Sequence, residues 1–218
     1  MLLSTLRAAV LANAFLLTPG AAVAQTFGEF LDKPELPLTF MGVDFSATRY
    51  YGPAMTVDPQ EMKGQFGKIN ELLEREADKY DLAKALHRTG PVNYATFLAE
   101  SANQKLDPGT ILVPRGTAPR PHFTPQTVEE LVGHYAYPAG SSGVGLVFVV
   151  EDLVKNQEQE IFWATFVDLS TGKMLYTEKL AGTGAGIGFR NHWASPLNAG
   201  IKTMKFLYGK WKKKFAAA

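Results

Sequence analysis

The sequence contains no cysteine among its 218 residues. This absence excludes disulfide bonds, thiolate metal ligands, cysteine nucleophiles and cysteine-linked lipid anchors. A large positive charge is also lacking, because the formal net charge is only +1, and we therefore expect no nucleic-acid partner. Apolar residues make up 46% and charged residues 20%, which is typical of a globular protein and excludes a wholly disordered chain.

A long hydrophobic run is missing too, but residues 1–24 have the pattern of a secretory signal peptide. Arg7 precedes a short apolar stretch, and the triplet at 22–24 is Ala-Val-Ala, the small-x-small pattern of a cleavage site. The apolar stretch is too short to span a membrane comfortably. We expect cleavage before Gln25 and a soluble periplasmic or secreted protein without a transmembrane span; the alternative is a buried N-terminal helix.

The rest of the chain reads as an extended lead-in over 25–37 and a single α/β domain over 38–215. A strand is predicted over 38–47 and a three-stranded antiparallel meander over 143–180, whose last turn is Asp168-Leu169-Ser170-Thr171-Gly172. Helices are predicted over 58–87, 94–102 and 124–135, with loops at 50–53 and over the proline-rich segment 108–125. The predicted fold is an α/β (α+β) sandwich in which helices pack on a mixed sheet.

The C-terminal segment is predicted to be a long amphipathic helix. Large apolar residues recur every three or four positions: Trp193, Leu197, Ile201, Met204, Tyr208, Trp211 and Phe215. Asn191 or Ser195 is expected to cap this helix, with Pro196 in its first turn.

Positive charge is concentrated in the same segment. From Lys179 to the end there are eight basic residues and no acidic one. A basic helix face can bind an anionic lipid, glycan or protein. The candidate partner-binding residues are Arg190, Lys202, Lys205, Lys212 and Lys213; the alternative is an ordinary solvated face.

Cofactor motifs are absent from the sequence. The glycines of 182–188 are all two apart, which does not match the dinucleotide fingerprint, so this segment is interpreted as a connector or as a place where another backbone approaches closely. The four histidines are far apart and form no metal-binding spacing. We therefore expect no cofactor and no metal, while a zinc centre assembled from distant residues is left open. Acid–base pairing among Asp44, Glu151, Asp152 and Asp168 is also left open.

The order of elements, together with the turn at 167–175, resembles envelope α/β domains. These are the amino-terminal domain of TolB, curli-secretion-type lipoproteins and lipoprotein activators of penicillin-binding proteins. The resemblance implies a non-catalytic interaction domain and supplies no catalytic residues.

We therefore expect an exported, non-catalytic accessory protein of the bacterial cell envelope that binds an envelope protein or an anionic envelope component. Two alternatives are kept. One is a periplasmic small-molecule or glycan-binding protein that uses the segment 182–188 and exposed aromatic residues. The other is a hydrolase with an acid–base pair among the carboxylates of the meander.

Overall fold

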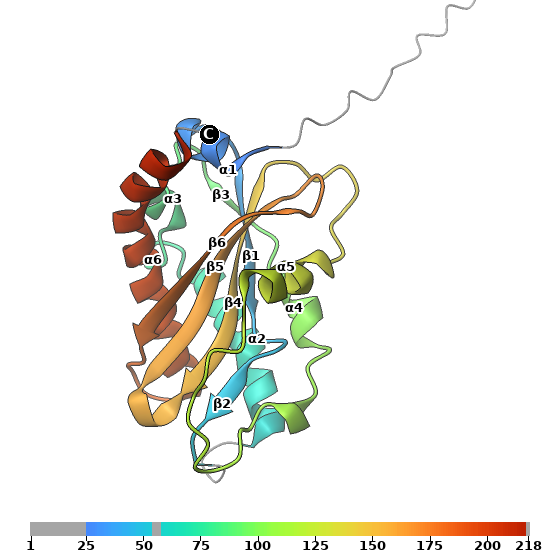
Figure 1. The fold of residues 1–218 in the computed structure, drawn as a ribbon, viewed down its shortest axis with the longest axis vertical. Helices are drawn as coiled ribbons and strands as arrows, with labels where there is room; N and C mark the ends of the chain where they lie inside the picture. The colour runs from blue at the N-terminus through green and yellow to red at the C-terminus, as the bar shows by residue number, and fades with distance from the viewer. Residues whose placement is uncertain (1–24, 54–57, 217–218) are drawn as a thin grey trace, which may run out of the picture.

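A computed structural model describes residues 25–53 and 58–216, and the predicted signal peptide at 1–24 lies outside the described residues. The chain runs through α1 (Phe27–Asp32), β1 (Leu38–Asp44), β2 (Arg49–Tyr51), α2 (Pro59–Arg75), α3 (Leu82–Ala85), β3 (Val92–Tyr94), α4 (Phe97–Asn103), α5 (Pro125–Gly133), β4 (Val144–Val154), β5 (Gln159–Asp168), β6 (Met174–Thr183) and α6 (Phe189–Phe215). Short 3-10 turns lie at Pro108–Thr110 and Lys155–Gln157. Figure 1 shows the sheet in the middle, with α6 along one side and α4 and α5 on the other.

The six strands form one mixed sheet in the order β3-β1-β4-β5-β6, and β2 pairs with the end of β4. β1 runs parallel to β3 and β4, whereas β4, β5 and β6 form an antiparallel meander. All 11 residues of β4 are buried, as expected of a central strand covered on both sides. The predicted meander over 143–180 and the predicted mixed sheet are confirmed.

Two sets of side chains cover the two sides of the sheet. We call the side to which Phe148, Phe162 and Phe166 point the α6 face; α1, α2, α3 and α6 pack on it. The opposite side, to which Val147 and Trp163 point, is the α5 face, and α4 and α5 pack on it. The domain is thus a sheet between two helical layers.

The long C-terminal helix is confirmed, and its apolar stripe is buried from Trp193 to Trp211. Its start differs from the prediction, because α6 begins after Gly188 and has no side-chain cap. Pro196 lies inside the helix rather than in its first turn. Proline has no N–H for the carbonyl four residues earlier. The Ser195 hydroxyl instead donates to that carbonyl, the one of His192, at 3.1 Å.

The lead-in over 25–37 is not wholly extended, because it contains the helix α1. The sequence signal is a capping box, in which the Thr26 hydroxyl accepts from the backbone N–H of Glu29 and the Glu29 carboxylate accepts from that of Thr26. Phe27 lies against Phe215 near the end of α6, with ring centroids 5.1 Å apart. α1 therefore joins the start of the described chain to its end (Figure 1).

Three further predictions were wrong in detail. The helix expected over 58–87 is two helices, because α2 ends at Arg75 and Asp81 caps α3 by accepting from the N–H of Lys84. Tyr50 and Tyr51, expected in the loop at 50–53, belong to β2, which pairs with β4. The helix expected from residue 94 begins at Phe97, because 92–94 pair with β1 as β3.

Candidate functional site

The outer side of α6 carries a cluster that we call the basic face: Lys202, Lys205, Phe206, Lys210 and Lys213. Counted from Lys202, the other four lie 3, 4, 8 and 11 positions further along, all three- or four-residue steps or sums of them, so the five share one side of the helix over about 16 Å. All five are exposed, and Phe206 is 81% exposed. α6 contains no acidic residue to neutralise them. Lys210 and Phe206 were not among the candidates predicted from the sequence, although their spacing from Lys202 places them on the same side of the helix.

Two of the candidate partner-binding residues lie apart from the basic face. Lys212 is half-buried and forms an ion pair with Asp32 of α1, at 3.1 Å. Arg190 lies in the first turn of α6, where its guanidinium donates to the side chain of the adjacent Asn191. The structure therefore gathers Lys202, Lys205 and Lys213 but not the other two.

A second cluster is buried on the α5 face, where β4 contains a β-bulge. The pairing of β4 with β5 shifts register between Val150 and Asp152, so Glu151 is the extra residue. Val150 and Leu153 both point to the α6 face. The two residues between them, Glu151 and Asp152, therefore lie together on the α5 face. A bulge re-aims side chains in this way, whereas regular alternation would separate neighbours.

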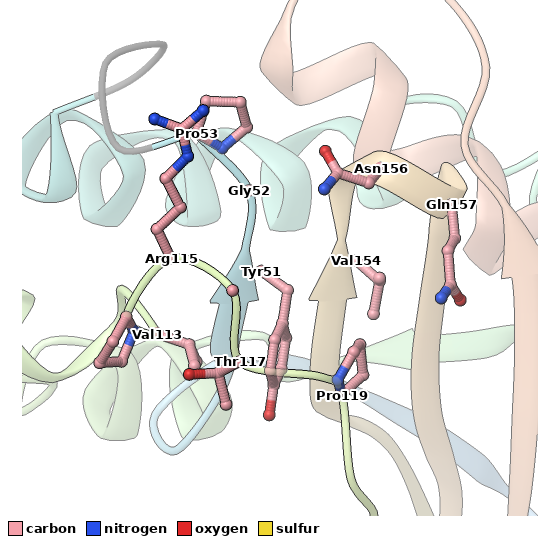
Figure 2. A pocket seen from close by; sticks show the side chains of 12 residues that line it. Tyr51, Gly52, Pro53, Val113, Arg115, Thr117, Pro119, Val154, Asn156 and Gln157 are labelled. Carbon is pink, nitrogen blue, oxygen red and sulfur yellow. The ribbon is translucent and has the colours of Figure 1, made fainter.

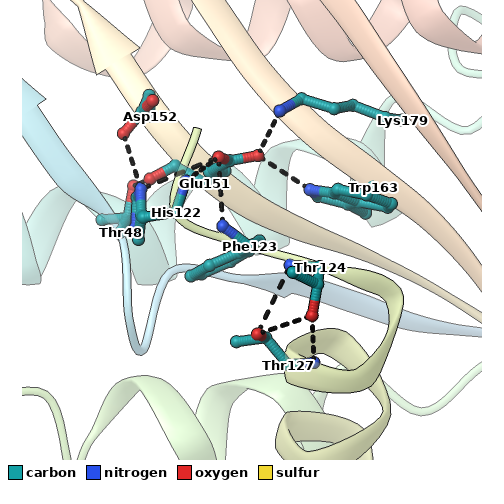
Figure 3. A network of polar contacts seen from close by, with 9 residues as sticks. All are labelled: Thr48, His122, Phe123, Thr124, Thr127, Glu151, Asp152, Trp163 and Lys179. Carbon is teal, nitrogen blue, oxygen red and sulfur yellow. Dashed lines mark hydrogen bonds and ion pairs between the residues drawn. The ribbon is translucent and has the colours of Figure 1, made fainter. Parts of the chain in front are cut away.

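Glu151 is fully buried and surrounded by donors (Figure 3). Its Oε2 accepts from Trp163 Nε1 at 2.9 Å and pairs with Lys179 Nζ at 2.8 Å. Its Oε1 accepts from the backbone N–H groups of His122 at 2.8 Å and Phe123 at 3.3 Å. Burial raises the pKa of Glu151, but the four donors outweigh burial and hold that pKa below its ordinary value. Glu151 is therefore an ionised carboxylate.

The loop that ends at α5 brings His122 to the same place. Thr124 begins α5 with a capping box, and the two residues before it contact Glu151. The His122 Nδ1 atom lies 3.5 Å from Asp152 Oδ1 and 3.7 Å from Glu151 Oε1. Burial and the Arg49 charge lower the pKa of His122, although Glu151 and two backbone carbonyls oppose this. Burial and the Glu151 charge raise the pKa of Asp152 to about 7, against Arg49 and Lys179.

A small pocket, which we call pocket 1, continues along the same strands. β2 pairs with β4 so that Arg49 lies beside Asp152 and Tyr51 beside Val154. Tyr51 and Val154 line pocket 1 together with Arg115, Asn156, Gln157 and the chain around Thr117 and Pro119 (Figure 2). Because two strand residues span about 6.6 Å, pocket 1 is close to the cluster. Its volume is about 240 Å³, below the roughly 300–1,000 Å³ of typical ligand pockets.

The other two carboxylates that the sequence proposed as acid–base partners lie elsewhere. Asp44 is buried at the end of β1 and accepts from the Tyr135 hydroxyl at 2.5 Å. Burial raises the pKa of Asp44. Asp168 accepts from the Ser170 hydroxyl and from the backbone N–H of Gln25 at 2.9 Å. Only Glu151 and Asp152 form a pair.

The glycine-rich segment 182–188 allows the close backbone approach that the sequence analysis described. A Cβ atom on Gly182 would lie 2.6 Å from the carbonyl oxygen of Pro196, which is closer than atoms can pack. Gly186 and Gly188 line a second pocket of about 220 Å³ with Tyr50, His192 and Trp193. The segment therefore lets α6 lie against the end of β6.

No protein-family model, curated protein or solved structure matches this chain. None of the helices in the described part of the chain combines the length and the apolar character needed to cross a bilayer.

Proposed function

We propose that this is an exported, non-catalytic interaction protein of the bacterial cell envelope, and that it binds an anionic envelope component through the basic face of α6. The observation that carries the proposal is the exposure of Phe206 among four lysines. Three lysines in the last turn of α6, at 212–214, also complement the helix dipole, so they have a structural use. Lys202, Lys205 and Lys210 lie before that turn and stabilise no helix end.

An anionic membrane surface fits this arrangement best. Aromatic side chains enter the boundary between lipid headgroups and acyl chains, and lysines beside them pair with anionic headgroups. Each lysine close to an anionic surface contributes about 1 kcal/mol. Three lysines therefore contribute about 3 kcal/mol, which is roughly a hundredfold in affinity.

Export is part of the proposal and is supported by the sequence pattern over 1–24. The resemblance to envelope α/β domains points to the same compartment. Comparison of the amino terminus of the protein purified from its host with the full sequence tests this part. A start at or within two residues of Gln25, in the periplasmic fraction, is expected; an intact Met1 in the cytosolic fraction would refute export.

Vesicle sedimentation tests the binding. We expect the protein to sediment with vesicles that contain an anionic phospholipid and to remain in solution with neutral phosphatidylcholine vesicles. Replacement of Lys202, Lys205 and Lys210 by Ser should weaken binding about a hundredfold at low salt, and added salt should weaken binding by the parent.

A matched control separates the basic face from total charge. Lys68, Lys105 and Lys173 are exposed and lie outside α6. Their replacement by Ser removes the same charge and should leave most of the binding. Equal loss in both triple variants, or equal sedimentation with neutral vesicles, would contradict the proposal. The Phe206→Ser variant should also bind more weakly, although it keeps every charge.

The volumes of the two pockets bear on the alternative function of small-molecule or glycan binding. Pocket 1 measures about 240 Å³ and the pocket beside segment 182–188 about 220 Å³. Both volumes are below the usual range for small-molecule sites. Three other pockets, of about 640, 410 and 370 Å³, lie within that range, and Ile187 and Gly188 of the segment line the one of about 410 Å³, so pocket volume is compatible with the ligand-binding alternative.

A further inference from the structure

The contacts of His122 on the α5 face have distances that hydrogen bonding does not explain. Its Nδ1 atom lies 3.5 Å from Asp152 Oδ1 and 3.7 Å from Glu151 Oε1, beyond the usual 2.7–3.2 Å of a hydrogen bond from nitrogen to oxygen. Asp152 is 1% exposed, and within the described part of the chain neither of its carboxylate oxygens has a hydrogen-bond partner. Buried groups of this kind call for an explanation, such as an ion.

The 3.5 Å distance falls within the spacing of ligand atoms around a metal ion, and the 3.7 Å distance lies just above it. Zinc binds nitrogen and carboxylate oxygen at about 2.0–2.2 Å, and the edge of a tetrahedron is about 1.6 times that length, or roughly 3.3–3.6 Å. One nitrogen and two carboxylate oxygens, from His122, Glu151 and Asp152, all lie within 4.8 Å of one another. The three side chains are thus arranged as a ligand set.

We propose that His122, Glu151 and Asp152 bind a divalent transition-metal ion of the zinc class. An imidazole nitrogen with carboxylates suits zinc, whereas calcium requires six to eight oxygen ligands and magnesium a nearly ideal octahedron. Three protein ligands leave one tetrahedral position for water or another small ligand.

The surroundings of Glu151 orient it for this role. Trp163 and Lys179 hold Oε2, so Oε1 is the oxygen that faces His122. The N–H group of His122, at 2.8 Å, fixes the position of Oε1 from the loop, and the longer bond from the N–H group of Phe123, at 3.3 Å, is the one that an ion on Oε1 would displace. Hydrogen bonds to a ligating carboxylate are the usual outer support of a metal site.

A second histidine–carboxylate pair allows a comparison of nitrogen–oxygen distances within the same protein. His192 Nε2 lies 2.6 Å from Glu158 Oε2 at the base of α6. Two atoms so close already contact each other and leave no space for a cation between them. The longer separations at His122 are therefore specific to that cluster.

Isothermal titration calorimetry of the full chain from residue 25, first stripped with a chelator, tests the proposal with zinc chloride. We expect one site per chain, and a melting temperature that rises with zinc because the ion binds only the folded form. Cobalt(II) at the same site should give the intense visible absorption of tetrahedral coordination. Magnesium and calcium at the same concentrations should not bind.

Two variants and two controls locate the ion. His122→Gln and Asp152→Asn each remove a ligand and should weaken zinc binding at least tenfold. His134→Gln and Asp78→Asn remove exposed groups of the same kinds and should bind as the parent does. The metal-free melting temperature shows that each variant is folded, and Asp152→Asn replaces a buried carboxylate that accepts no hydrogen bond within the described residues, so it should fold. Failure of the parent to bind zinc at millimolar concentration, equal binding by the ligand variants, or preference for calcium would each overturn the proposal.

Discussion

A buried glutamate on one face of the sheet differs from one on the other in its hydrogen-bond donors and in the direction of its pKa shift. Glu151 on the α5 face and Glu160 on the α6 face are both fully buried, on neighbouring strands. Glu151 has four donors, whereas neither carboxylate oxygen of Glu160 has a partner within the described residues. The pKa of Glu151 is lowered, and burial alone raises the pKa of Glu160 well above 4.5. Partners, and not burial, decide the charge of these side chains.

The difference reflects what covers each face. Long helices cover the α6 face, and their side chains are mostly apolar and aromatic. Much of the cover over Glu151 is the loop before α5, whose backbone N–H groups remain available as donors. The α6 face therefore supplies stability, whereas the α5 face can hold charged groups in a fixed geometry.

The largest expected effect is on the α6 face. Trp211 is 2% exposed and contacts Phe27, Phe166 and Tyr176. Its replacement by Ala should lower the free energy of unfolding by about 3–5 kcal/mol, because it leaves a cavity in a packed core. Denaturant titration measures this. An unchanged transition would show that the apolar stripe of α6 is not part of the core.

A smaller loss is expected on the α5 face from Glu151→Gln. The amide group turns an N–H group toward existing donors and removes the charge that faces Lys179. We expect a loss of about 2–3 kcal/mol, less than for a fully buried ion pair, because the Lys179 side chain is 34% exposed. The same denaturant titration checks it. A stabilised variant would show that the four donors are not satisfied by the carboxylate.

Glu160→Met should have the opposite sign. It removes a buried polar group without partners and should stabilise the protein by roughly 1–3 kcal/mol at pH 8. In the unfolded chain Glu160 ionises as the pH rises above its ordinary pKa of 4.5. In the folded protein burial raises its pKa, so Glu160 is still protonated above pH 4.5. The free energy of unfolding of the parent therefore falls as the pH rises above 4.5.

Thermal melts from pH 4 to pH 9 measure this effect. The gain in the Met variant should be smallest near pH 4 and grow toward pH 8. Asp44 and Asp152, whose pKa values are also raised, are common to both proteins and cancel in the difference. A gain that does not change with pH would contradict the assignment of a raised pKa to Glu160.

The smallest effect on stability is expected from the outer side of α6. Replacement of Lys202, Lys205 and Lys210 by Ser should change the free energy of unfolding by less than about 0.5 kcal/mol per site, because exposed charges contribute little. Denaturant titration of the triple variant checks this. A large loss would mean that these lysines belong to the fold rather than to a binding surface.

Patterns of apolar residues predicted the core elements of the fold. The continuous apolar run of β4 and the regular stripe from Trp193 to Trp211 lead directly to a central strand and a packed helix. Short elements were missed because they depend on tertiary pairing: β2 and β3 have three residues each and exist by bonding to β4 and β1. The separation of α2 from α3 was missed because apolar spacing continues through the turn that ends at the buried Tyr80.

The candidate metal cluster could be predicted only in part. Glu151 and Asp152 stood out as carboxylates on a strand, but regular alternation places neighbours on opposite faces. The pattern of apolar residues in this strand does not reveal the β-bulge. The bulge is what puts both residues on the α5 face. His122 is 29 residues from Glu151 in sequence. The position of His122 beside Glu151 depends on the path of a proline-rich loop, and the periodicity of apolar residues does not predict the path of a loop.

The claim that the α5 face holds charged groups in a fixed geometry is tested most directly by anomalous scattering at the zinc edge from crystals grown with zinc chloride. The account predicts a peak within bonding distance of His122 Nδ1 and of the Glu151 and Asp152 carboxylates, and none between His192 and Glu158. The absence of a peak at the cluster while zinc occupies other sites, or a peak at the His192–Glu158 pair alone, would contradict it.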